Sequence, residues 1–239
     1  MPIRTYLWLE DRKGKASYIF WEHFMRVLYP DVIVESKKNN SELVKAVRSL
    51  TDDINRYIIV FDNSFDNFQA YQELKLLEKY VNDKSNISIM NIICFEYLLL
   101  EFDQLIQWIY APDDDFRLKR ATAILARDTL VGALKSGDLN YRALRDVVEY
   151  DRKLDDHNIE QLSAKLLFDL TRNTGFEVSK GNIGECWIQS CCDWTRRQPD
   201  DICGLDSQRL SIDDKMKRIY AGTSLCRELP HVGLEATVL

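Results

Sequence analysis

Seven consecutive residues, Arg56-Tyr57-Ile58-Ile59-Val60-Phe61-Asp62, decide the fold class of this chain. A short apolar run rich in β-branched and aromatic residues is typical of a buried strand. A second such run, Tyr6-Leu7-Trp8-Leu9-Glu10, also ends on a carboxylate. In an open α/β sheet, ligands collect beyond the carboxyl ends of the parallel strands. We therefore expect Glu10 and Asp62 to lie side by side at one edge of a sheet, with Asp66 one short loop further on.

The first 110 residues alternate strand patterns with helix patterns. Strands are expected at 6–10, 31–35, 56–62 and 87–94, and helices at about 18–28, 42–50, 68–81 and 95–102. Strands that alternate with helices of about 10 to 15 residues predict right-handed crossovers and a parallel sheet. The predicted fold class is therefore α/β, with a parallel sheet of about four strands flanked by helices.

The pattern changes beyond residue 110. Helices are expected at about 116–135, 141–150, 158–172 and 213–220, whereas 176–204 shows little periodicity. We predict an α/β domain over residues 1–110 and a mostly helical domain over residues 111–239. The sequence leaves open the alternative that these helices complete one fold.

Composition limits the class of protein and of partner. The chain has 239 residues, of which 46% are apolar and 29% charged, as in ordinary soluble globular proteins. A net charge of −6 gives no bulk attraction to nucleic acid or anionic membranes, so a polyanion must be held by local basic patches. No run approaches the roughly 20 apolar residues of a membrane span, and the amino terminus lacks a signal-peptide pattern. The expected location is the cytoplasm.

Carboxylates supply the candidate chemistry. Glu10, Asp62 and Asp66 are the candidate catalytic groups and metal ligands, with Glu96 and Asp11 as further candidates. Carboxylates at hydrogen-bonding distance raise one another's pKa, and Mg²⁺ or Mn²⁺ resolves the conflict because hard cations prefer oxygen ligands. A metal held in this way polarises a phosphodiester and activates an attacking water. The alternative for Asp66 is a helix cap.

Basic residues follow the first two expected strands. The candidate phosphate-binding residues are Arg12, Lys13 and Lys15 after the first strand, and Lys37 and Lys38 after the second. In a parallel sheet, both clusters lie at the same edge as the acids. Cations beside a metal site can hold phosphate oxygens on either side of a scissile bond.

With these motifs the chain resembles the Toprim (topoisomerase–primase) domain, in which an acid ends the first strand and an aspartate-rich turn follows a later one. The run Ile93-Cys94-Phe95-Glu96-Tyr97-Leu98-Leu99-Leu100-Glu101-Phe102 is similar to a segment of RloB-like and OLD-like Toprim proteins of bacterial anti-phage systems. The resemblance covers about residues 3–110 and rests on three short motifs. It implies magnesium-dependent phosphodiester cleavage, with Glu10 matching the family's glutamate and Asp62 its first aspartate.

The chain departs from the family pattern at Ser64, because the second aspartate of the family usually stands there. Three hypotheses follow: a nuclease, a protein-binding scaffold and, as the third, a phosphoryl-transfer enzyme that acts on small molecules. In the first, the protein is a metal-dependent nuclease that cuts DNA or RNA as a toxic effector of antiviral defence. Its control would come from a partner such as an ATPase, from an RNA element or from self-association. An ATPase would be a separate chain, since this sequence has no GxxxxGK[ST] phosphate loop. In the second, it is a catalytically degenerate Toprim scaffold that binds another protein.

Four cysteines within 18 residues form a separate motif: Cys186, Cys191, Cys192 and Cys203. Four thiolates can close a tetrahedral structural zinc site. Cys191 and Cys192 are adjacent and cannot easily both bind one ion in an extended segment, so His157 or His231 could replace one of them. The alternative is that these cysteines are small buried hydrophobic residues.

Overall fold

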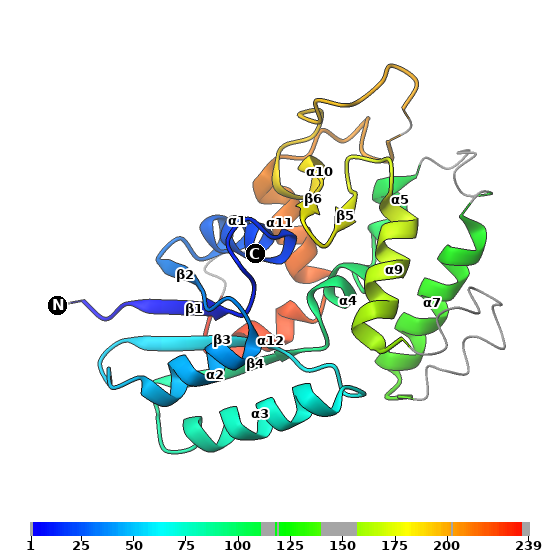
Figure 1. The fold of residues 1–239 in the computed structure, drawn as a ribbon. Coiled ribbons are helices and arrows are strands. Elements are labelled where there is room, and N and C mark those ends of the chain that lie inside the picture. The colour runs from blue at the N-terminus through cyan, green and yellow to red at the C-terminus, as the bar shows by residue number, and fades with distance from the viewer. Residues whose placement is uncertain (1, 111–117, 119, 140–156, 202, 236–239) are drawn as a thin grey trace.

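The computed structural model describes residues 2–110, 118, 120–139, 157–201 and 203–235. Its centre is a four-stranded, all-parallel sheet in the order β2-β1-β3-β4 (Figure 1). The strands are β1 (Thr5–Leu9), β2 (Val32–Ser36), β3 (Arg56–Asp62) and β4 (Ile87–Ile92). The predicted α/β class with a four-stranded parallel sheet is confirmed. Among the described helices, none combines the length and the hydropathy that a membrane span requires.

Helices cover both faces of the sheet because consecutive side chains of β1 and β3 are apolar and point alternately to opposite faces. Leu7, Ile58 and Val60 belong to the core on the face of α1 (Ala16–Leu28). Trp8, Ile59 and Phe61 pack instead with α2 (Asn40–Ser49) and α3 (Phe68–Val81). Figure 1 shows α1 on one side of the sheet and α2 and α3 on the other. Strands buried on both faces are typical of parallel sheets.

Over its described residues, the chain from residue 95 onward is mostly helical and carries one small hairpin. Its elements are α4 (Phe95–Leu100), α5 (Leu105–Ile109), α7 (Ala121–Lys135), α9 (Ile159–Thr171), β5 (Val178–Ser179), β6 (Asn182–Ile183), α10 (Glu185–Ile188), α11 (Ile212–Ala221) and α12 (Leu225–His231). The helices expected at 158–172 and 213–220 are confirmed as α9 and α11. The helix expected at 141–150 lies outside the described residues, and the β5–β6 hairpin was not predicted.

Both halves share one hydrophobic core. A single buried cluster contains Leu7 of β1 and Leu234 beyond α12. Its contacts join α4 to α9, α1 to α11, and β4 to α12. Buried cations also tie the elements together: Arg127 of α7 donates to the carbonyl oxygens of Leu100 and Phe102 at 2.8 Å each. The boundary at residue 110 stays a prediction; the larger buried cluster spans both described halves, and a second one lies between the sheet, α2 and α3.

Candidate active site

A cavity of about 440 Å³ lies where the strands end. Glu10, directly after β1, and Asp62, the last residue of β3, both line it. Glu96, in the first turn of α4, lines the same cavity, as does Asp11. The parallel pairing of β1 with β3 and of β3 with β4 brings these positions to one edge. Four of the acids named from the sequence therefore share one space.

The two central acids hold their protons more tightly than isolated carboxyls do. Burial raises the pKa of Glu10 to about 8, and the charges of Asp11 and Glu160 add to the effect. Burial also raises the pKa of Asp62 well above its ordinary value, with Glu10 and Glu96 as the next causes. Each ionised group therefore makes ionisation of the others less favourable.

Glu96 and Asp11 extend this network. Burial raises the pKa of Glu96 to about 7, and the charges of Glu160 and Asp11 contribute. Burial raises the pKa of Asp11, while a hydrogen bond from Ser17 and the charge of Lys15 oppose the shift. The cluster thus carries protons near neutral pH unless a cation compensates its charge.

Glu160 is a site residue that sequence reasoning missed. It lies in the first turn of α9, lines the cavity, and raises the pKa of Glu10, Asp62 and Glu96. Its carboxylate lies 3.5 Å from the hydroxyl of buried Ser64. An acid in the first turn of a helix is common, so no sequence pattern connects this one with β3.

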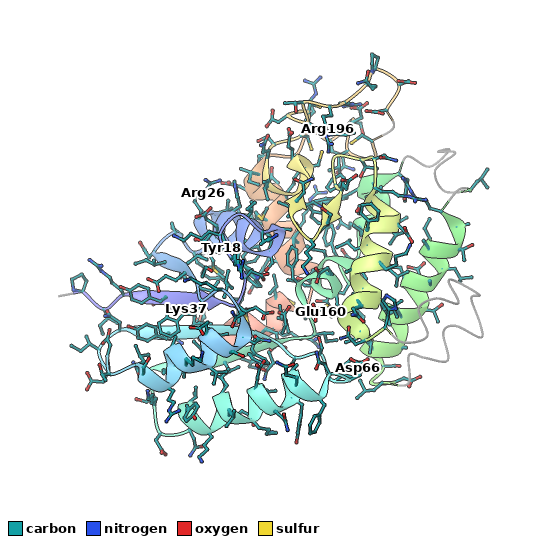
Figure 2. All side chains as sticks on the ribbon, in the orientation of Figure 1. Tyr18, Arg26, Lys37, Asp66, Glu160 and Arg196 are labelled. Atoms are coloured by element: carbon teal, nitrogen blue, oxygen red, sulfur yellow. The ribbon has the colours of Figure 1, made fainter. Side chains whose placement is uncertain are left out.

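Asp66 has a different place from the other candidate ligands. It is not among the side chains that line the cavity. Its two carboxylate oxygens accept the backbone N–H of Ile159 at 3.1 and 3.3 Å. Asn158 caps the same end of α9 through a capping box with Gln161. Asp66 therefore accepts a backbone N–H at the start of α9, as a helix cap does. Figure 2 shows Asp66 and Glu160 near this end of α9.

The basic residues divide into two groups. Lys15 lines the cavity, whereas Arg12 and Lys13 are exposed outside it. Lys37 donates to Glu35 at 2.8 Å, and its ammonium lies 3.8 Å from the ring centroid of Trp8. Figure 2 places Lys37 apart from Glu160.

Two further lysines, Lys38 and Lys180, differ in whether they line the cavity. Lys38 adopts a positive φ of 76° in the turn before α2 and does not line the cavity. Lys180, which was not predicted, does line the cavity, from the turn of the β5–β6 hairpin. Lys15 and Lys180 are therefore the lysines that this space brings together with the acids.

The acids share a cavity without forming a ready-made ligand set. In the described part of the chain, no three His, Cys, Asp or Glu side chains are grouped closely enough to hold a metal ion. The donor chemistry nevertheless fits a hard cation, because Mg²⁺ and Mn²⁺ prefer carboxylate oxygens and retain several waters. Binding of Mg²⁺ or Mn²⁺ by Glu10, Asp62 and Glu96 stays a prediction.

The cysteine cluster lies elsewhere. Cys186, Cys192 and Cys203 line a second cavity of about 30 Å³, together with Trp108 and Trp194. All six cysteines are free thiols. Burial raises the pKa of Cys186 to about 12. A zinc ion at this cluster stays a prediction, as does the participation of His157 or His231.

Comparison with known proteins finds no protein similar to this chain. No protein-family model, curated protein or solved structure matches the chain.

Proposed function

We propose that this protein is a metal-dependent nuclease of Toprim type that hydrolyses phosphodiester bonds in DNA or RNA. One observation carries the proposal: five carboxylates and two lysines line one cavity beyond the carboxyl ends of parallel strands. Ligands collect at that edge in open α/β sheets. The raised pKa values of Glu10, Asp62 and Glu96 add support, because perturbed carboxyls in a cleft are typical of functional sites.

Each group has a role in this proposal. Glu10, Asp62 and Glu96 would hold Mg²⁺ or Mn²⁺, with Glu160 in place of the absent second aspartate of the family pattern. The bound ion would polarise the phosphodiester. Glu10, where it does not ligate the ion, would accept a proton from the attacking water as general base. Lys15 would hold a phosphate oxygen.

The resemblance to anti-phage Toprim proteins is the basis for a proposed biological role. We propose a cytoplasmic effector of antiviral defence whose toxicity is controlled by a regulatory partner, such as an ATPase, or by self-association. A chain with a net charge of −6 binds nucleic acid only where cations are concentrated, which agrees with a local substrate contact at Lys15.

Cleavage of a mixed set of nucleic acids tests the activity. Plasmid DNA, single-stranded DNA and total RNA are incubated with wild type, Glu10→Gln and Asp62→Asn in Mg²⁺, in Mn²⁺ and in EDTA. We expect cleavage by wild type in metal only, and a loss of at least about 100-fold in each variant. Exposed Glu22 of α1 provides the matched control, because Glu22→Gln removes a carboxylate outside the cavity. Equal cleavage by wild type and Glu10→Gln would overturn the assignment.

The second candidate function is a catalytically degenerate scaffold that binds a partner protein. Ser64 in place of an aspartate favours it, as does the absence of a preformed metal-ligand group among the described residues. Calorimetric titration with Mg²⁺ and Mn²⁺ separates the two. A scaffold shows no binding heat for either ion and no difference between wild type and Asp62→Asn.

A further inference from the structure

A stripe of side chains on helix α9 forms one side of the cavity. Glu160, Gln161, Ala164 and Phe168 all line the space, and the spacing of four residues from Glu160 to Ala164 and from Ala164 to Phe168 places these three along one face. The opposite face of α9 is buried in the core through Leu162, Leu166 and Leu170 among others. The cavity is thus acidic at the start of this stripe and aromatic at its end.

Phe168 is the aromatic residue of α9, and 38% of its surface is exposed. At a rise of about 1.5 Å per residue, its Cα lies about 12 Å along the helix from that of Glu160. The ring therefore stands in the same cavity but away from the carboxylates. An exposed aromatic face next to a phosphate site is a platform on which a base can stack.

The β5–β6 hairpin adds a cation to this space. Lys180 lies in its turn, is exposed, and has no ion pair with another described residue. A methyl group built on Gly181 would lie 3.9 Å from Nζ of Lys15, so the turn meets the lysine that follows β1. Val178 and Ser179 of the same hairpin line the cavity together with Phe168. The lysines therefore gather where the hairpin closes the space.

We propose that the cavity binds an unpaired nucleotide strand, with a base stacked on Phe168 and a neighbouring phosphate held by Lys180 and Lys15. This inference deepens the proposed nuclease function and rests on it, since the carboxylate end of the stripe is where the scissile phosphate would lie.

The size of the cavity favours an unpaired strand over a duplex. Pockets of about 300 to 1,000 Å³ hold single small ligands, and 440 Å³ is at the lower end of that range. Stacking on a side chain requires an unstacked base, which single strands, loops and ends provide and a regular duplex does not. Stacking is also tolerant of sequence, because every base has a π-face.

Binding measured without cleavage tests the proposal. Fluorescein-labelled 10-nucleotide single-stranded DNA, single-stranded RNA of the same sequence, and the matching DNA duplex are titrated with protein in EDTA and in Ca²⁺, with fluorescence anisotropy as the readout. We expect at least 10-fold tighter binding of one or both single strands than of the duplex. Tighter binding of RNA than of DNA identifies RNA as the source of the strand, and the reverse identifies DNA.

Substitutions separate stacking from packing. Phe168→Leu keeps apolar bulk but removes the π-face, so we expect single-strand binding to weaken roughly 5- to 100-fold, while Phe168→Trp keeps it. Lys180→Gln should weaken binding and lower the slope of log K against log salt by about 1. The controls are Tyr71→Leu, an exposed aromatic on α3, and Lys217→Gln, an exposed lysine on α11, both outside the cavity.

Two outcomes would overturn the inference: duplex binding as tight as single-strand binding, or wild-type affinity in Phe168→Leu. The proposed hydrolysis fails on a different result. Strand binding that depends on Phe168 without any Glu10-dependent cleavage leaves this inference standing and removes the nuclease. Glu10-dependent cleavage with no effect of Phe168→Leu on strand binding removes this inference and leaves the proposed nuclease standing.

Discussion

The hydroxyl oxygen of Ser64 lies 3.5 Å from a carboxylate oxygen of Glu160. This contact joins the loop after β3 to the start of α9, two segments that are far apart in the chain. In the proposed comparison with Toprim domains, Ser64 stands where that pattern usually has an aspartate, and the fold places a glutamate from another helix beside it. The serine thus leaves room for the charge of Glu160.

Restoring an aspartate at this position should be harmful without metal. Ser64 is 1% exposed, so Ser64→Asp would bury a second carboxylate against Glu160. We expect it to lower the free energy of unfolding in EDTA by more than about 2 kcal/mol, whereas Ser64→Ala should cost about 1 kcal/mol or less. Chemical denaturation at pH 8 measures both. Equal stability of the two variants would contradict the placement of Glu160.

The raised carboxyl pKa values predict that stability without metal falls as pH rises. A carboxyl whose pKa is higher in the folded than in the unfolded state stabilises the fold below the unfolded pKa and loses that effect as pH rises through the folded pKa. For Glu10 this window runs from 4.5 to about 8. We expect Glu10→Gln to flatten the decline and to gain about 1 to 3 kcal/mol over wild type at pH 8.5. Denaturation curves in EDTA from pH 5 to pH 9 check this, with Glu22→Gln as the control.

Divalent cations should restore the stability that the metal-free protein loses as pH rises. Because Mg²⁺ competes with protons for the carboxylates, 10 mM Mg²⁺ should raise the melting temperature at pH 8 but have little effect at pH 5.5. An ion at about 100 times its dissociation constant stabilises the fold by about 2.7 kcal/mol. The reference is potassium chloride at equal ionic strength. A shift that persists in Asp62→Asn would show that the ion binds elsewhere.

Asp66 and Asp62 should respond differently to loss of charge. Asp66→Asn keeps an oxygen that accepts the N–H of Ile159, so cleavage should stay within about 3-fold of wild type, while Asp62→Asn abolishes it. Asp66→Ala removes the acceptor and should cost about 1 kcal/mol of stability, as for a lost helix cap. Equal loss of cleavage in the two asparagine variants would instead make Asp66 a metal ligand.

The thiols of the cysteine cluster should differ in reactivity. Cys192 is exposed and has a positive φ of 73°, whereas Cys186 is buried and burial raises its pKa to about 12. Because the thiolate is the nucleophile, Cys192 should react before Cys186 with a disulfide reagent in the native protein. Cys192→Ser should remove that early reaction. Protection of Cys192 that ends when a chelator is added, with about one zinc per chain, would confirm the zinc prediction.

The central strand and its following helix were predictable because their signals are local. β3 runs over Arg56–Asp62 and α3 over Phe68–Val81, as expected from the apolar run and the helical pattern after it. The end of β4 was misplaced by two residues. Cys94 is not in the strand but caps α4, where its sulfur accepts the N–H of Tyr97 at 3.3 Å. Cysteine is a rare cap, so an apolar run gives no sign of it.

The other half of the site depends on tertiary structure. Glu160 and Phe168 reach the cavity because α9 packs on α4, a contact that no local pattern encodes. Lys180 depends on a hairpin with two-residue strands, which are too short to show an alternating pattern. The sequence therefore indicated the acids that follow strands, and the fold added the residues that face them.

The packing of α12 against β4 has a practical consequence. β4 is an edge strand of the sheet, and Leu229 of α12 shares the core cluster with Ile92. A recombinant fragment that stops near residue 110 would lack α12 and leave the apolar side chains of β4 that share this cluster exposed, and large exposed apolar patches cause association. Such a truncation should aggregate, so structural work on the acidic cavity calls for a chain that includes α12.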